Sequence, residues 1–228
     1  MGVLVKELDS SGMSGFWTYL SRRSSSIIEL FGEHFLVSTL SLVIALIIGV
    51  GLGLLVWNRP LPRGAVLAAA GVILTIPSFA LLGLLIAPLG LGWTPTVVAL
   101  VMYALLPIVR NTVVGLQEVP RPVQEAARGV GMTKARVLLR VQLPIAWPVI
   151  LTGARVSAQL VVGIAAIAAY VSGPGLGDLI FSGLSSLGSK NALNQAVVGT
   201  IGVVIVALVM DAAFTVLRRL TTSKGLNV

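Results

Sequence analysis

Few side chains in this sequence are placed to do chemistry. The 228 residues include no cysteine, so disulfides, thiolate metal sites and cysteine nucleophiles are excluded. No Gly-x-x-x-x-Gly-Lys-Ser/Thr phosphate loop occurs, so any nucleotide must bind to another chain. Arg155 and Asp211 are the ionisable residues that fall clearly within long apolar stretches, where a charge must face protein or water. We expect Asp211 to pair with Arg155 or Arg110 as a structural lock, although Arg155 can also reach the end of its helix or face a cavity. We expect no metal or other cofactor in this chain.

The elements that carry these residues are strongly apolar. Hydrophobic residues make up 56% of the chain and charged residues 11%, whereas soluble domains carry about a quarter charged residues. The net charge of +8 could indicate nucleic acid, but Lys and Arg also collect in the cytoplasmic loops of membrane proteins. The composition therefore predicts an integral membrane protein in a lipid bilayer, without a nucleic-acid partner. No cleavable signal peptide is expected, because the first 34 residues are rich in charge and lack a long apolar run.

Five stretches are long and apolar enough to cross a bilayer as helices. A helix needs roughly 20 apolar residues to cross a hydrocarbon core of about 30 Å. Continuous apolar runs favour helices over barrel strands, which alternate in character over about 10 residues. The sequence therefore predicts an all-α membrane protein with about five transmembrane helices, which are Phe35–Trp57, Ala65–Leu89, Trp93–Leu116, Pro148–Val171 and Ala196–Leu217.

Basic residues indicate which loops face the cytoplasm. The link between the first two spans, the loop at residues 117–147 and the tail after the last span are basic and should lie inside. Residues 172–195 hold only Lys190 and should face outward, which with five spans puts the N-terminus outside. His34, at the first entry into the membrane, is interpreted as an interfacial polar residue.

The chain divides into three parts on this interpretation. They are an N-terminal arm at residues 1–34, a transmembrane domain at residues 35–217 and a cytoplasmic tail at residues 218–228. Within the arm, Ser24–Phe35 is predicted to lie at the membrane interface as an amphipathic helix. A disordered polar arm is an equal alternative for residues 1–15.

The longest basic loop has the pattern of two short helices joined by a bend. Pro122 suits the first turn of a helix, and Gly129 and Gly131 should end it. Thr133 should cap a second helix, which Pro144 should stop before the next span begins.

The same loop resembles the cytoplasmic motif of binding-protein-dependent ABC importer permeases. That motif is Glu-Ala-Ala, three residues, Gly, nine residues, Ile, one residue and Leu-Pro, and here only the Ile differs, being replaced by the similarly apolar Val. The matching residues, with the first glycine of the bend, are Glu125, Ala126, Ala127, Gly129, Gly131, Val141, Leu143 and Pro144. The resemblance implies that the loop forms a coupling helix that docks into a cleft of an ATPase subunit. The two small alanines would permit close approach, Glu125 would pair with a polar or basic group of the partner, and Gly131 would permit the bend.

The resemblance also implies a fold and a set of partners. The fold would be that of the methionine-permease-like ABC importers, with about five membrane helices and a cytoplasmic coupling helix. The partners would be ABC ATPase subunits that bind ATP and Mg, a second permease chain that is identical or paralogous, and an extracellular or periplasmic substrate-binding protein. The chain would then be a non-enzymatic, multi-pass subunit in a bacterial plasma (inner) membrane.

Three other segments look like those of permeases that import osmoprotectants such as glycine betaine, carnitine and choline. They are residues 75–83, 103–112 and 173–177, although the family usually has Gly where Pro174 stands. From this resemblance we expect the translocation pathway or its gate to include Thr75, Pro77, Ser78, Tyr103, Asn111, Gly173, Gly175 and Gly177. The alternatives are an ABC permease for amino acids or another small solute and, from another class, a self-contained secondary transporter or channel.

Pro77 interrupts the second predicted span and frees a backbone carbonyl, which Thr75 or Ser78 could satisfy. A broken helix that lines a passage and a tolerated kink are both compatible with this proline.

Aromatic residues bear on the solute, because binding a quaternary ammonium group tightly takes several ring faces, each contributing roughly 0.5 to 2 kcal/mol. Apart from tryptophans near the span ends, the aromatic residues of the predicted spans are scattered over four helices. They are Phe79, Tyr103, Tyr170 and Phe214. We therefore expect selectivity to lie mainly in the binding protein, and this chain to offer a low-affinity passage.

Overall fold

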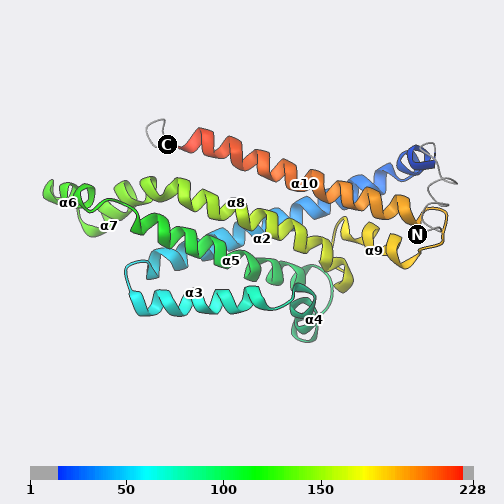
Figure 1. Cartoon of the computed structure of the whole chain (residues 1–228), viewed down its shortest axis with the longest axis horizontal. Helices are drawn as coiled ribbons and strands as arrows, with labels where there is room; N and C mark the ends of the chain where they lie inside the picture. The colour runs from blue at the N-terminus through cyan, green and yellow to red at the C-terminus, as the bar shows by residue number, and fades with distance from the viewer. Residues whose placement is uncertain (1–14, 223–228) are drawn as a thin grey trace. The chain divides into compact units, whose positions relative to one another are not determined.

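The computed structural model of the chain describes residues 15–222, and every regular element in this range is helical (Figure 1). Most of the predicted polar arm, residues 1–14, and the end of the predicted tail, residues 223–228, lie outside the described residues. Residues 15–22 are helical. They are followed by α2 (Ser24–Val56), α3 (Pro60–Thr75), α4 (Ser78–Leu89), α5 (Trp93–Gln117), α6 (Arg121–Gly129), α7 (Lys134–Val137), the π-helix η1 (Leu138–Gln142), α8 (Leu143–Ile167), the 3₁₀-helix η2 (Ala168–Val171), α9 (Gly177–Ser185) and α10 (Ala192–Thr221).

Four helical segments within residues 15–222 are long and apolar enough to cross a membrane. They are α2, α5, the continuous segment from α7 to η2, and α10. A fifth span results if α3 and α4 are taken together as one broken crossing. The prediction of an all-α membrane protein with about five spans is confirmed.

The second predicted span, Ala65–Leu89, is wrong as a single helix. Helix α3 ends at Thr75, and Ile76 adopts an extended conformation with φ −68° and ψ 128°. Pro77 follows with φ −55° and ψ 132°, and α4 begins at Ser78. A proline ring disfavours the α conformation of the residue before it, so Ile76 leaves the helix and the chain breaks there. Of the two interpretations of Pro77, the structure has the broken helix and not the kink.

The predicted stop at Pro144 is also wrong. Helix α7 passes into α8 through η1, where the N–H of Leu143 donates to the carbonyl of Leu138, five residues earlier. A proline inside an α-helix loses one hydrogen bond and crowds the carbonyl four residues back, here that of Arg140. The wider π turn η1 ends at Gln142, two residues before Pro144, and the helix continues through the proline as α8.

The predicted interfacial segment Ser24–Phe35 is not separated from the first span, because α2 runs through both without a break. Its depth in a membrane stays a prediction. His34 lies in this stretch and is fully buried within the chain, with its Nε2 3.2 Å from the carbonyl oxygen of Val162.

The described chain forms two compact units, to which α2, α5, α8 and α10 each contribute residues. Unit 1 comprises residues 15–41, 77–100 and 161–209. Unit 2 comprises residues 42–76, 101–160 and 210–222.

In unit 2 the helices approach one another through glycines. A Cβ atom added at Gly53 of α2 would lie 2.6 Å from Cβ of Thr112 on α5, and one added at Gly49 would lie 2.7 Å from a side-chain carbon of Ile108. Gly49 and Gly53 are four residues apart and therefore share one face of α2, as in the small-xxx-small packing of membrane helices. A hydrogen bond adds to this packing, since Ser157 Oγ of α8 donates to the carbonyl of Ala104 on α5 over 2.8 Å.

In unit 1 the link between η2 and α9 is tightly packed. Gly175 has φ +108°, which suits glycine, and a Cβ atom added there would lie 2.7 Å from Cβ of His34. A Cβ atom at Gly173 would lie 2.6 Å from Oγ1 of Thr96, and one at Gly177 would meet the carbonyl of Ala166. Close packing thus explains three glycines in a segment of five residues.

Candidate functional site

The loop between α5 and α8 contains the predicted pair of helices, and its first helix is formed as expected. Pro122 stands in the first turn of α6, and α6 ends at Gly129. Gly131 then takes φ +84°, a left-handed conformation in which any other residue would be strained. The amide of Gln124 donates from Nε2 to the carbonyl of Val119 over 2.9 Å and ties α6 to the link that follows α5.

The second loop helix begins as predicted. Thr133 is extended, with φ −65° and ψ 158°, and its hydroxyl accepts the backbone N–H of Arg136 at 3.4 Å. This is the geometry of a helix N-cap. The chain therefore turns between α6 and α7 within four residues, Val130 to Thr133.

The two motif alanines face in different directions. Ala127 is buried against the chain itself, with 8% of its surface exposed, whereas Ala126 is exposed. Val123 and Val130 are also exposed, at 39% and 77%. Residues three, four and seven apart lie on one side of a helix, so Val123 and Ala126 of α6 and Val130, the residue that caps its C-terminus, form an exposed apolar stripe. We call this set the α6 stripe.

Charge surrounds the α6 stripe. Glu125 is exposed and forms no ion pair with any residue in the range 15–222. Arg121 and Arg128, at the two ends of α6, are exposed as well. The helix therefore offers an apolar strip with one free carboxylate beside it.

The last part of the motif anchors the loop. Leu143 packs against a buried cluster of Leu116, Ala146 and Ile150 in unit 2, whereas Pro144 is exposed. Val141, the one departure from the family motif, is half-buried within η1. The motif thus combines exposed residues on α6, Glu125 and Ala126, with a packed anchor, Leu143, at the start of α8.

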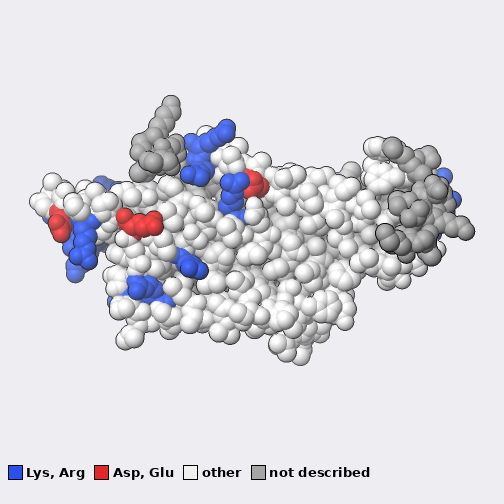
Figure 2. All heavy atoms as spheres, in the orientation of Figure 1, with Lys and Arg blue, Asp and Glu red and all other residues white. Residues whose placement is uncertain are grey.

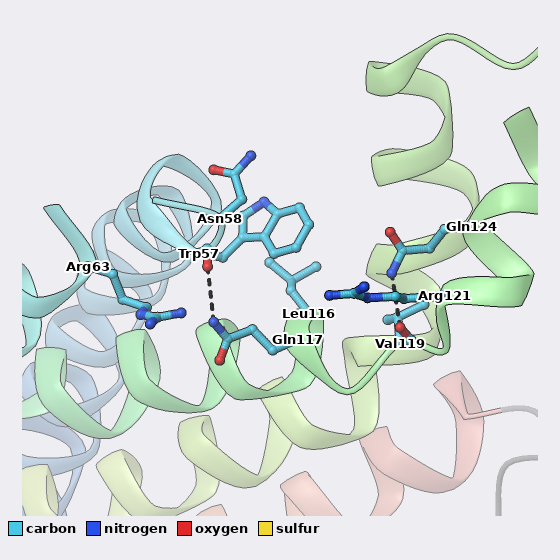
Figure 3. Close-up of a pocket in the computed structure, with 8 residues that line it drawn as sticks. All are labelled: Trp57, Asn58, Arg63, Leu116, Gln117, Val119, Arg121 and Gln124. Atoms are coloured by element: carbon cyan, nitrogen blue, oxygen red, sulfur yellow. Dashed lines mark hydrogen bonds between the residues drawn. The ribbon is translucent and has the colours of Figure 1, made fainter. Parts of the chain in front are cut away.

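A hollow of about 400 Å³ opens beside α6, between the link from α2 to α3 and the end of α5 (Figure 3). The amide of Gln117 donates from Nε2 to the carbonyl of Trp57 over 3.2 Å and joins the two sides. The guanidinium groups of Arg63 and Arg121 approach the hollow from opposite sides (Figure 3). The remaining lining residues are Asn58, Leu116, Val119 and Gln124.

Basic residues are concentrated in unit 2. Its described part holds eleven Lys and Arg residues and three Asp and Glu residues, whereas that of unit 1 holds three of each kind. On the face drawn in Figure 2, basic side chains gather over α6, α7 and the C-terminal end of α10. This asymmetry is the one that membrane proteins show between cytoplasmic and external loops.

Arg155 and Asp211 are brought together between α8 and α10 of unit 2. Arg155 Nε donates to Oδ1 of Asp211 over 2.5 Å and Nη2 donates to Oδ2 over 2.6 Å, so the pair is bidentate. Gln159 Nε2 donates to the same carboxylate over 3.2 Å. Sequence reasoning missed Gln159, although its spacing of four residues from Arg155 places both on one face of α8. Both charged side chains remain partly exposed, at 42% and 28%.

Of the expected pathway residues, Tyr103 has a defined partner at the helix break. Its hydroxyl donates to the carbonyl of Ile76 over 2.6 Å. Thr75, which was expected to satisfy a carbonyl freed by Pro77, instead donates to Val72 within its own helix. The carbonyl four residues before Pro77, that of Ile73, accepts the N–H of Ile76 over 3.2 Å. The donor to Ile76 itself comes from α5, 27 residues further along the chain, so only the tertiary structure could identify it.

The other expected pathway residues are not gathered into one site. Asn111 bonds the carbonyl of Pro107 within its own helix, over 2.8 Å. Ser78 is half-buried at the start of α4, and the three glycines of residues 173–177 are buried in unit 1. In residues 15–222 no group of three or more His, Cys, Asp or Glu side chains could hold a metal ion.

Known proteins resemble this sequence over most of its length. Residues 41–223 match the protein family described as binding-protein-dependent transport system inner membrane component. The chain is 34% identical over 215 residues to OpuCB, a glycine betaine/carnitine/choline transport system permease protein of Bacillus subtilis, covering 94% of this chain and 97% of the relative. It is 37% identical over 215 residues to OsmW, an osmoprotectant import permease protein of Salmonella typhimurium, covering 92% and 98%.

Solved structures share the fold. A chain of the MetNI methionine ABC transporter in an inward-facing conformation superposes with a TM-score of 0.76 at 22% identity, covering 89% of this chain and 99% of that chain. A second crystal form of the same transporter gives a TM-score of 0.72 at 24% identity. The prediction of a methionine-permease-like fold is confirmed.

Proposed function

Because the chain belongs to the family of binding-protein-dependent transport system inner membrane components, and is thus a permease subunit of an ABC importer, we propose that it forms half of a solute pathway that an ATPase drives through α6. ATP and Mg would be bound by that ATPase. The second half of the pathway would come from another permease chain, identical or paralogous, and an external binding protein would deliver the solute.

The α6 stripe is the observation that carries the coupling assignment. Val123, Ala126 and Val130 expose apolar surface along a short helix and its C-cap in the most basic loop of the chain, outside the candidate spans. An exposed apolar strip rimmed by charge is typical of a protein-binding surface. Glu125 lies beside it with no ion-pair partner in the described chain, so it is free to bind a basic or hydrogen-bonding group of the ATPase.

A bulky residue on the α6 stripe tests this assignment. Ala126→Trp should abolish solute-stimulated ATP hydrolysis and uptake, because it enlarges the exposed face that must enter a cleft. Ala127→Trp would test less, because Ala127 is buried and the variant would disturb the loop itself. The measurements are ATPase activity and uptake by the reconstituted transporter. Ala69→Trp, at an exposed alanine of α3, is the control and should retain both.

Charge reversal is the electrostatic counterpart. Glu125→Lys should weaken copurification with the ATPase by roughly tenfold or more, since a charge-assisted bond between proteins is replaced by repulsion. Glu118→Lys changes the same charge in the same loop outside the motif, and it should leave copurification unchanged. Full coupling in both Ala126→Trp and Glu125→Lys would remove the assignment.

Alternating access is the proposed mechanism. ATP-driven closure of the ATPase subunits would move α6 in both permease chains and open the pathway outward, and hydrolysis would return it to the inward-facing state. The orientation assumed here puts the basic loops of unit 2 in the cytoplasm.

An osmoprotectant such as glycine betaine, carnitine or choline is the proposed solute. Support comes from the relatives named above, which the chain matches over nearly their full lengths. An amino acid or another small solute is the alternative, since the fold is shared with a methionine transporter. Calorimetric titration of the cognate binding protein with betaine, choline and amino acids separates the two. Binding of an amino acid alone would overturn the osmoprotectant assignment and leave the permease role intact.

A further inference from the structure

Three aromatic rings from different elements meet in unit 1. The rings of Phe79 in α4 and Tyr170 in η2 have centroids 4.0 Å apart, and the rings of Tyr170 and Phe181 in α9 have centroids 6.4 Å apart. We call these residues the aromatic trio. Phe79 and Tyr170, which looked scattered in the sequence, are therefore neighbours, and Phe181 lies outside every predicted span.

The aromatic trio is not a packed core. Tyr170 is 58% exposed and Phe79 is 43% exposed, whereas Tyr103 is 3% exposed. Aromatic faces carry negative electrostatic potential, which attracts a cation within about 6 Å of the ring centroid. Phe79 and Tyr170 are stacked on each other, so a cation cannot enter between them, and Tyr170, the most exposed of these rings, offers its uncovered surface to a cation.

The trio lies next to the broken helix. Phe79 stands two residues after Pro77, and both are exposed in the described chain. Within a membrane, non-helical backbone is tolerated only where it is buried in protein or lines a water-filled cavity. The chain itself does not bury Pro77, so this principle favours water or protein, and not lipid, beside the start of α4.

The same unit carries carboxylates that favour a cation. Asp178 precedes Phe181 by three residues on α9 and therefore lies on a neighbouring part of its surface. Asp178, Glu33 and Trp93 line a hollow of about 350 Å³ beside residues 172–175. Neither carboxylate forms an ion pair with any residue described, so their charge is available to draw cations toward this part of unit 1.

We propose that the aromatic trio is a low-affinity contact site for the quaternary ammonium head of the transported solute. The site would use cation–π attraction from the exposed surface of Tyr170, with Phe79 stacked on that ring and Phe181 beside it. The inference rests on the proposed function, which supplies the solute class. The aromatic residues of this chain are therefore not all scattered, contrary to expectation. The expectation that the permease binds its solute weakly is unchanged.

The direct test uses the full chain in lipid nanodiscs and tetramethylammonium as the probe, detected by saturation-transfer difference NMR at millimolar concentration. Removal of one ring face should weaken apparent binding roughly two- to fivefold. Tyr170→Leu is the principal variant, because a side chain that is more than half exposed can be replaced without a cavity. Phe79→Leu, which removes the ring stacked on Tyr170, should have a smaller effect, and Tyr170→Phe, which keeps the ring, should bind as the unchanged chain does.

Two controls separate cation–π attraction from non-specific hydrophobic binding. Phe35→Leu removes another partly exposed phenylalanine, one that makes no ring contact with the trio, and should not change the signal. Neopentyl alcohol has nearly the shape of tetramethylammonium without its charge, and its signal should not depend on Tyr170.

Equal tetramethylammonium binding by Tyr170→Leu and the unchanged chain would overturn the inference. An equal dependence of neopentyl alcohol on Tyr170 would also overturn it, because the trio would then be an apolar surface for lipid or for another chain. Neither result touches the proposed function, since this experiment involves no ATPase or binding protein. Conversely, failure of the ATPase to copurify would leave the NMR result standing.

Discussion

At the scale of single residues, Arg155 and Asp211 show that charged side chains within the apolar helices are paired with each other. The carboxylate receives two bonds from Arg155 and one from Gln159, so its oxygens are engaged from α8. Both side chains are nevertheless partly exposed, and a charge cannot face lipid cheaply. Water or another protein chain must therefore cover this side of α8 and α10.

The pair predicts an asymmetric double-mutant cycle. Arg155→Leu should lower the apparent melting temperature and the yield of folded protein, because it leaves the Asp211 carboxylate without its main partner. Arg155→Leu combined with Asp211→Leu should recover most of that loss, since no unpaired charge remains. Fluorescence-detected size-exclusion chromatography after heating measures both variants.

Arg110→Leu is the control for this cycle, because Arg110 is exposed and forms no ion pair in the described range. A double variant that is stable but inactive would assign the pair a role in transport. Wild-type stability in Arg155→Leu would contradict the lock.

The exposure of α6 residues could not be obtained from the motif alone. Glu125, Ala126 and Ala127 were assigned by resemblance to one docking function, yet Ala127 faces the chain and Ala126 faces away from it. A helical repeat of about 3.6 residues separates consecutive positions by roughly 100°. That rule predicts that neighbours differ, but which of them is buried depends on how α6 rests on the rest of unit 2.

At the scale of elements, sequence rules worked where local chemistry decides. Pro122, Gly131 and Thr133 mark the ends of α6 and α7 because a proline, a left-handed glycine and a capping hydroxyl act on their immediate neighbours. They failed at Pro144, where a π turn outside the usual expectations for proline carries the helix onward. The sequence alone does not decide between a broken helix and a kink at Pro77. The hydroxyl of Tyr103, which bonds the carbonyl of Ile76 at the break, is too distant in sequence to be assigned there.

The contact of α2 with α5 predicts a sharp difference between two nearby glycines. Gly53→Ala would place a methyl group 2.6 Å from the side chain of Thr112, so the helices must separate, at a cost of about 1–3 kcal/mol. Gly51 has no heavy atom within 4 Å of an added Cβ, and Gly51→Ala should be neutral or stabilising, by up to about 1 kcal/mol. Apparent melting temperatures of the two variants, purified side by side, measure the difference. Equal values would mean that α2 and α5 do not pack through this face.

At the scale of the whole molecule, membrane class, helical architecture and family could all be predicted from the sequence. They depend on hydropathy, on charge counts and on the spacing from Glu125 to Pro144, all of which are properties of the chain itself. The grouping of Phe79 with Tyr170 and Phe181 could not be predicted, because Phe79 lies 91 residues before Tyr170 and 102 before Phe181. Residues that share no local segment meet only through tertiary packing.

The orientation of the chain can be measured without background labelling, because the sequence has no cysteine. Ala135→Cys, at an exposed position of α7, should react with a membrane-impermeant maleimide only in inverted vesicles. Ser189→Cys, at an exposed position between α9 and α10, should react in intact spheroplasts. The reverse pattern would place the basic loops outside and remove the proposed access of an ATPase to α6.

The π turn ahead of Pro144 has a mechanical meaning. Because α7, η1 and α8 form one uninterrupted helix of about 34 residues, at about 1.5 Å per residue, a force applied to α7 acts on a lever roughly 50 Å long. Such a force would either move the whole helix as a rigid body or convert the π turn η1 into regular α-helix. That conversion would shift the register of the residues after η1 by one position. The π turn ahead of Pro144 is thus the place in this helix where a movement of α7 would be absorbed or transmitted to α8.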